Sequence, residues 1–283
     1  MEYAQEYLQR DGERIGLHVY PDPGSGPAVV VWPAMGTPAR YYRHFAAALA
    51  GAGFAVTVAD LRGTGSSTPS ASRASGYGYA DLVDDVGAVL DAATARLDGR
   101  PVLLLGHSLG GQTCALYLAL TQDPRVAGLV LVAVGLPYWR AYPGRGRLWA
   151  LSLSLGMAAS AAVLGVWPGW GFGGRQAGGV IRDWAYSARH GRYPRLAGVD
   201  VEALLGNVTT PVLAVSVDDD RYTPPSTVDH LCGKLGGAPV ERAHYTRDES
   251  GGPLDHFPGP ARAVRSPPGS PRSPRASPTQ ADA

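Results

Sequence analysis

Apolar and polar positions divide the chain into short runs and longer periodic segments. Mainly apolar runs are typical of buried strands; they occupy residues 28–32, 54–59, 102–105, 126–134 and 211–217, with another strand expected near 239–243. Helical periodicity occupies residues 41–52, 82–97, 109–120 and 226–235. Residues 14–20 alternate after Asp11-Gly12 and predict one arm of a hairpin. Strands alternating with helices predict an α/β class protein, with a mainly parallel sheet covered on both faces.

The alternation of strands and helices divides the chain into parts. It stops near Gly135 and resumes at residue 211. We therefore expect an α/β core formed by residues 1–135 and 209–257, interrupted at residues 136–208 by an insertion that forms a helical cap. Residues 258–283 are rich in proline, serine and arginine. Such a tail cannot bury a core and is expected to be disordered.

Composition limits the class of protein without naming a function. The 283 residues are 45% hydrophobic and 17% charged, which is ordinary for a globular protein. A net charge of +1 creates no field that would attract nucleic acid. Two cysteines cannot make a disulfide framework, and the polar N-terminus has no secretory signal, so a cytoplasmic location is expected. Metal-ligand spacings and phosphate or dinucleotide motifs are missing from the sequence, so neither a metal nor a cofactor is expected.

The candidate chemistry centres on Gly106-His107-Ser108-Leu109-Gly110, between a predicted strand and a predicted helix. A Gly-x-Ser-x-Gly turn in this place must be sharp, and its glycines remove side chains that would otherwise collide. The helix N-terminus favours negative charge on a reacting group. An idle serine in a glycine-rich turn is the plainer interpretation. The strand before the turn and the helix after it favour Ser108 as a nucleophile.

Two motifs carry a resemblance to a known superfamily. The segment from Gly106 to Gly111 resembles the nucleophile elbow of α/β-hydrolases, and the segment from Asp60 to Ser67 is similar to their Asp-x-Arg-Gly-x-Gly-x-Ser turn. The resemblance covers roughly residues 10–257. Pro33-Ala34-Met35-Gly36 and an Asp-Asp-x-x-x-Pro-Pro stretch are similar to a bacterial subgroup near the serine-aminopeptidase and monoglyceride-lipase type. The resemblance implies the α/β-hydrolase fold and a serine, an acid and a histidine in that chain order.

The resemblance places the acid after a late strand. The apolar run that ends at residue 217 continues into Asp218-Asp219-Asp220, followed by Pro224. The family pattern Asp-x-x-x-Pro matches Asp220, with Asp219 as the second choice and Asp218 as a further competitor. Acidic residues are also common in turns and helix caps. However, the other place for an acid, directly after residues 126–134, contains no carboxylate.

The resemblance places the base after the acid, where three histidines occur. His256 is preferred because Leu254-Asp255-His256-Phe257 is similar to the family's Gly-His-Phe motif, although Asp255 replaces the glycine. His244, at the end of a strand, is the second choice. His230 is expected on a helix surface. His107, inside the elbow, is expected to point away from Ser108 and to serve packing.

An oxyanion hole needs two backbone N–H groups near Ser108. The resemblance assigns one to Leu109, the residue after the nucleophile. It assigns the other to the loop after the first buried strand, where alignment of the turn selects Met35. This loop reads Pro-Ala-Met-Gly, whereas related families often have His-Gly there.

The insertion bears on the substrate because it holds five of the six tryptophans, namely Trp139, Trp149, Trp167, Trp170 and Trp184. Residues 148–167 are uncharged and long enough to span a bilayer, but their serines and glycines and the sheet that continues beyond them favour a cap. An apolar cap predicts a small-molecule substrate with an apolar acyl or aromatic group. The alternative is that these side chains only pack the cap onto the core. Transient contact with a lipid surface stays open.

The resemblance implies a serine hydrolase that cleaves a carboxylic ester of an apolar or acyl substrate through an acyl-enzyme. One alternative keeps the same residues in a thioesterase or acyltransferase of a biosynthetic pathway. The other is a hydrolase-fold protein with impaired catalysis. In the family a closing helix normally follows the histidine loop, and residues 258–283 offer no such helix. A changed C-terminus could leave Ser108 without its base.

Overall fold

The computed structural model describes residues 1–10, 12–252 and 254–257, and the predicted disordered tail, 258–283, lies outside them. An eight-stranded sheet has the order β1-β2-β4-β3-β5-β6-β9-β10. The strands span β1 (Ala4–Arg10), β2 (Glu13–Val19), β3 (Ala28–Trp32), β4 (Ala55–Ala59), β5 (Val102–His107), β6 (Val126–Val132), β9 (Val212–Val217) and β10 (Val240–Tyr245). The six strands from β4 to β10 in this order are parallel, and β1 and β2 form the expected hairpin. The α/β-hydrolase architecture is confirmed.

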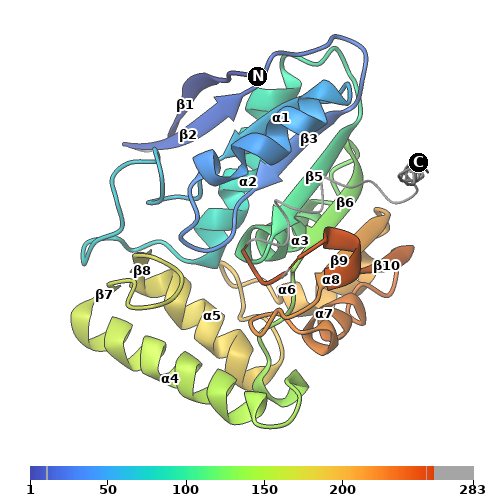
Figure 1. Cartoon of the computed structure of the whole chain (residues 1–283). Coiled ribbons are helices and arrows are strands. Elements are labelled where there is room, and N and C mark those ends of the chain that lie inside the picture. The colour runs from blue at the N-terminus through green and yellow to red at the C-terminus, as the bar shows by residue number, and fades with distance from the viewer. Residues whose placement is uncertain (11, 253, 258–283) are drawn as a thin grey trace, which may run out of the picture.

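Helices cover both faces of the sheet (Figure 1). The 3₁₀ helix η1 (Ala39–Tyr42) and helix α1 (Arg43–Gly51) pack on one face; α2 (Tyr79–Thr94), α3 (Leu109–Thr121) and α7 (Pro225–Cys232) pack on the other. The predicted helix over 41–52 therefore begins two residues earlier, as a 3₁₀ turn. Every residue from Leu109 to Ala119 is buried, so α3 has a fixed place beneath the sheet, and its first turn adjoins Ser108.

Part of the α1 face is open. An open groove of about 720 Å³ lies along β6, β9 and β10, and apolar side chains such as Leu103, Val130 and Leu213 line it. These three residues are only partly buried. In the described part of the chain, α1 is the helix on this face and it lies toward β3 and β4, so the far strands stay uncovered.

The segment between β6 and β9 stands outside the sheet. It contains η2 (Trp139–Ala141), α4 (Gly146–Leu164), β7 (Val166–Trp167), β8 (Gln176–Ala177), α5 (Gly178–His190), α6 (Val201–Leu204) and η3 (Leu205–Asn207). Helices α4 and α5 pack together and lie apart from the sheet, at the lower end of the view in Figure 1. By length and composition, α4 is the one helix in the described residues that could cross a membrane. A short helix, α8 (Arg247–Ser250), follows β10.

The turn after β4 is organised by one carboxylate. Asp60 accepts hydrogen bonds from the N–H of Ala39 (2.5 Å), from the N–H of Ser66 (2.8 Å) and from the Ser66 hydroxyl (2.7 Å). Gly65 has φ +61°, and a Cβ there would lie 2.1 Å from an Asp60 oxygen. This turn therefore needs glycine, and Asp60 ties it to the chain that follows β3.

The turn between β5 and α3 is sharper still. Ser108 adopts φ 51° and ψ −120°, a conformation that L-residues avoid. A Cβ on Gly106 would lie 2.1 Å from the Cα of Gly111, and a Cβ on Gly110 would lie 2.4 Å from the Trp32 carbonyl oxygen. The N–H of Gly110 donates to the carbonyl of Pro33 at 3.1 Å. The loop after β3 thus packs directly against the start of α3.

We expect Gly110→Ala to lower the free energy of unfolding by about 1–3 kcal/mol, because backbone atoms must move to admit the methyl group. Gly156→Ala is the matched control, since Gly156 is exposed on α4 with open space around its Cβ position. Alanine there should stabilise the protein by roughly 0.5–1 kcal/mol. Urea unfolding measures both values, and equal stability of Gly110→Ala and wild type would contradict the packing described.

Candidate active site

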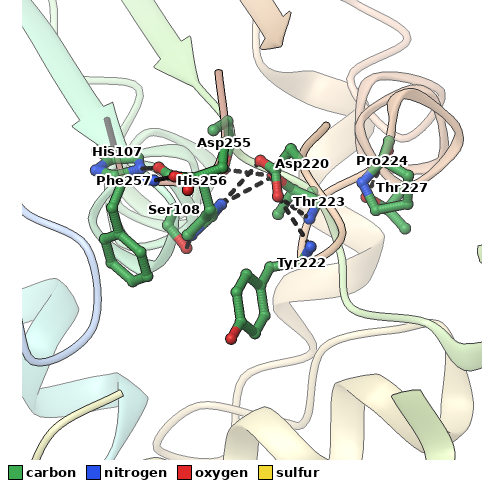
Figure 2. A network of polar contacts seen from close by, with 12 residues as sticks. His107, Ser108, Asp220, Tyr222, Thr223, Pro224, Thr227, Asp255, His256 and Phe257 are labelled. Carbon is green, nitrogen blue, oxygen red and sulfur yellow. Dashed lines mark hydrogen bonds and ion pairs between the residues drawn. The ribbon is translucent and has the colours of Figure 1, made fainter. Parts of the chain in front are cut away.

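Ser108 lies at the carboxyl end of β5, where the turn presents its hydroxyl outward. The Oγ atom is 2.9 Å from Nε2 of His256. His256 belongs to the chain after α8, 148 residues further along, and its side chain is buried. Figure 2 shows the two side chains facing each other. The structure therefore joins the serine expected from the elbow to the first-choice histidine.

The other ring nitrogen of His256 meets the first-choice acid. Nδ1 lies 2.8 Å from Oδ2 of Asp220, which follows β9. Because a carboxylate only accepts hydrogen bonds, Nδ1 carries the proton and Nε2 is free to accept the one from Ser108. The serine, imidazole and carboxylate form a continuous hydrogen-bond chain at the carboxyl edge of the parallel strands.

The carboxylate of Asp220 is held on both oxygens. Oδ1 accepts from the N–H groups of Tyr222 (2.9 Å) and Thr223 (2.8 Å), and Oδ2 accepts from the Thr223 hydroxyl as well as from His256. Burial favours the neutral acid, but the hydrogen bonds from His256 and Thr223 outweigh burial and lower the pKa of Asp220 below its usual value. This group is therefore a fixed negative charge behind the imidazole.

The second-choice residues bind elsewhere. Asp219 adopts φ +62° and pairs with the guanidinium of Arg247 at the surface. His244 lies between the Ser216 hydroxyl (2.9 Å) and a carboxylate oxygen of Asp218 (3.0 Å). Arg247 and Asp218, the partners of these two residues, have solvent-exposed side chains, and the structure brings neither Asp219 nor His244 to Ser108.

The two expected N–H donors belong to segments that adjoin the nucleophile. Leu109 begins α3, so its N–H has no carbonyl in the preceding helical turn to bond with. Met35 lies in the loop after β3, which the Gly110–Pro33 hydrogen bond holds against the elbow. The Met35 side chain packs beneath the insertion, because a Cβ on Gly173 would lie 2.7 Å from its sulfur.

Three polar residues around the site have contacts that the sequence interpretation missed. Thr223 binds Asp220, and an aspartate that accepts the N–H two residues on, as Asp220 does from Tyr222, is a known turn signal. His107 points away from Ser108, as expected, yet it makes polar contacts with Tyr42 and with the main chain of His256. The motif offered no signal for these partners, because they lie 65 and 149 residues away.

A small cavity of about 20 Å³ adjoins Ser108 and His256. Its walls include the aromatic side chains of Tyr142, Trp149, Phe172, Trp184 and Tyr222. This volume holds about one water molecule. An open groove of about 570 Å³ lies next to it, and Tyr142 and Trp149 line both spaces. These side chains form the wall between the nucleophile and the groove.

Four of the five tryptophans of the insertion divide into two groups. Trp149 and Trp184 line the small cavity. Trp167 is buried and donates its indole N–H to the carbonyl of Phe172 at 2.9 Å, while Trp170 is 64% exposed and packs on Trp167. Lining and packing, offered as alternatives by the sequence, therefore both occur.

No group of three or more His, Cys, Asp or Glu side chains in the described residues could hold a metal ion. Both cysteines are free, and Cys114 is buried in α3.

Comparisons with known proteins agree with this architecture. Residues 25–247 match the family described as serine aminopeptidase, S33. RutD of Variovorax paradoxus, named for carbamate hydrolysis, is 36% identical over 227 residues, which are 75% of this chain and 81% of RutD. The thioesterase domain from the curacin biosynthetic pathway superposes with a TM-score of 0.61 at 17% identity, covering 94% of this chain and 99% of that one.

Mouse α/β hydrolase domain-containing protein 10 superposes with a TM-score of 0.62 at 16% identity, covering 93% of this chain and 94% of that one. At these identities the two structural likenesses show the fold alone. The family match covers most of the chain and includes β5, the Ser108 turn and the Asp220 loop. The chain therefore belongs to the serine aminopeptidase S33 family of α/β-fold hydrolases.

Proposed function

We propose that this protein hydrolyses a carboxylic ester of an apolar or acyl substrate through a covalent acyl-enzyme. The observation that carries the proposal is the hydrogen-bond chain from Ser108 through His256 to Asp220. His256 accepts the proton of Ser108 as its oxygen attacks the carbonyl carbon, and then gives that proton to the leaving alcohol. Water, activated by the same imidazole, attacks the acyl carbon and releases the acid.

The charges that develop in this reaction have counterparts in the site. The imidazolium formed at His256 is stabilised by the carboxylate of Asp220, whose pKa is lowered by its hydrogen bonds. The oxyanion of the tetrahedral intermediate is assigned to the N–H groups of Met35 and Leu109. The N-terminus of α3 adds a favourable dipole at the same place.

The surroundings of Ser108 indicate the substrate class. Aromatic side chains contribute to the cavity wall, which favours an apolar acyl or aromatic group. A cavity of about 20 Å³ cannot hold such a group, so Trp149 or its neighbours must move for substrate to reach Ser108. The relative named for carbamate hydrolysis supports including carbamates among the compounds tested.

The direct test is a panel of chromogenic esters of increasing acyl length, with thioesters and carbamates added. We expect wild type to hydrolyse oxygen esters with an initial burst of alcohol, and to be labelled once by a fluorophosphonate. Ser108→Ala should lose labelling and lower kcat by on the order of 10⁶-fold. Turnover that survives in Ser108→Ala, or faster cleavage of thioesters than of matched esters, would contradict the proposal.

Substitution of Asp220, compared with substitution of its neighbour Asp219, tests the role of the acid. Asp220→Asn should lower kcat by about 10⁴-fold, because the amide no longer fixes the tautomer or stabilises the imidazolium. Asp219→Asn is the control, since Asp219 pairs only with Arg247 at the surface. It should stay within about twofold of wild type, as losing an exposed ion pair costs little. Equal losses in the two variants would mean that the acid is misassigned.

The cavity wall predicts a change in chain-length preference. Trp149→Ala should raise kcat/KM for long acyl esters by about 10-fold relative to short ones, since space of this kind discriminates by about 1–3 kcal/mol. Trp170→Ala removes a tryptophan of the same insertion that is exposed to solvent and should leave the preference unchanged. The ratio of kcat/KM values across the panel is the readout, and an unchanged ratio in Trp149→Ala would refute the assigned wall.

A further inference from the structure

His107 is a buried histidine that the proposed chemistry does not use. It ends β5, one residue before Ser108, and its side chain is 1% exposed. Its Nε2 lies 2.9 Å from the main-chain carbonyl of His256, and its Nδ1 lies 2.7 Å from the Tyr42 hydroxyl. Figure 2 shows His107 beside the chain that carries His256.

The direction of every hydrogen bond in this group follows from donor chemistry. The carbonyl of His256 can only accept, so Nε2 of His107 carries a proton. Burial, reinforced by the neighbouring His256, lowers the pKa of His107 to about 3, so the ring is neutral and Nδ1 is bare. Tyr42 must then donate to Nδ1, and its oxygen accepts the N–H of Ala34 at 2.9 Å.

This chain of hydrogen bonds connects two loops of the site. At one end Ala34 directly precedes Met35, the assigned oxyanion donor after β3. At the other end is the peptide of His256, the assigned base. One buried imidazole and one buried phenol therefore connect the loop of Met35 (residues 33–36, the donor loop) with the segment of His256 (residues 254–257, the base loop).

The base loop depends on such side chains for its position. Among the described residues 254–257, main-chain groups make no hydrogen bond with other main-chain groups. Side chains hold them instead: His107 donates to the carbonyl of His256, and Tyr41 donates to the carbonyl of Phe257. Tyr41 and Tyr42 both belong to η1, which follows the loop of Met35.

We propose that His107 is a positioning residue, which holds the main chain of His256 through an Nε2–H donor and couples it through Tyr42 to the loop of Met35. This inference rests on the proposed function, because it assigns a role in placing the base. This positioning role differs from a packing role because it requires a hydrogen-bond donor at the place of Nε2, facing the His256 carbonyl. A misplacement of about 1 Å at a reacting group can cost about 10²-fold in rate.

Two amide substitutions of His107 separate the effect of its hydrogen-bond donor from the effect of its side-chain volume. In His107→Gln the amide nitrogen reaches the place of Nε2 and can donate to the His256 carbonyl. In His107→Asn the shorter side chain can serve Tyr42 but not His256. We expect His107→Asn to lose about 10- to 100-fold in kcat with KM nearly unchanged, and His107→Gln to recover most of that loss. A His107→Asn variant as active as wild type, or equal losses of kcat in both variants, would overturn the proposal.

NMR of ring-labelled histidine provides a readout that packing alone would not move. Wild type should show His107 with the proton on Nε2 and bare Nδ1 throughout the neutral pH range. Tyr42→Phe removes the donor to Nδ1 and keeps the ring volume, so the Nδ1 signal should move while the proton stays on Nε2, and kcat should fall. A proton on Nδ1 in wild type would overturn the proposal. Thermal unfolding of each variant separates these effects from loss of fold.

The NMR readout also separates this inference from the proposed function. If wild type cleaves no ester and takes no fluorophosphonate, the proposed function fails. The ring signals of His256 still decide the role of His107 in that case. Their displacement in His107→Asn, with recovery in His107→Gln, supports positioning, and unchanged signals overturn it.

Discussion

Ser108 is held in a backbone conformation that costs about 1–3 kcal/mol for a residue with a Cβ. Its φ of 51° persists because the surroundings over-determine it: Gly106 and Gly110 allow strand, loop and helix to approach within contact distance, and α3 is buried along its length. The same turn places Ser108 between the carboxyl end of β5 and the first residue of α3. Everything else in the site is arranged around the oxygen of this serine.

Asp220 and His256, the proposed acid and base, are held near Ser108 by different interactions. Asp220 is placed by its own loop, whose N–H groups and Thr223 hydroxyl saturate the carboxylate, so a buried charge is compensated locally. His256 belongs to a loop whose described residues make no hydrogen bond between main-chain groups, and side chains from β5 and η1 hold its carbonyls. The precision of the site is therefore shared between a rigid turn and a set of side-chain anchors.

The sequence predicted much of this because its signals are local. Apolar runs located the strands, and the glycine spacing located the turn at Ser108. Differences arise where single dihedral angles decide: β6 ends at Val132 because Ala133 adopts φ 49°, two residues before the predicted end. Asp219 and Asp220 differ by one position, and only the loop conformation sends one to Arg247 and the other to His256. The partners of His107 and the size of the cavity depend on contacts between distant segments, which no local pattern records.

A crystal structure of the protein after reaction with a fluorophosphonate tests the account most directly. We expect phosphorus bonded to Oγ of Ser108, with the phosphoryl oxygen within hydrogen-bond distance of the N–H groups of Met35 and Leu109. His256 should remain between that serine and Asp220. Phosphorus on another residue, or a phosphoryl oxygen directed away from both N–H groups, would contradict it.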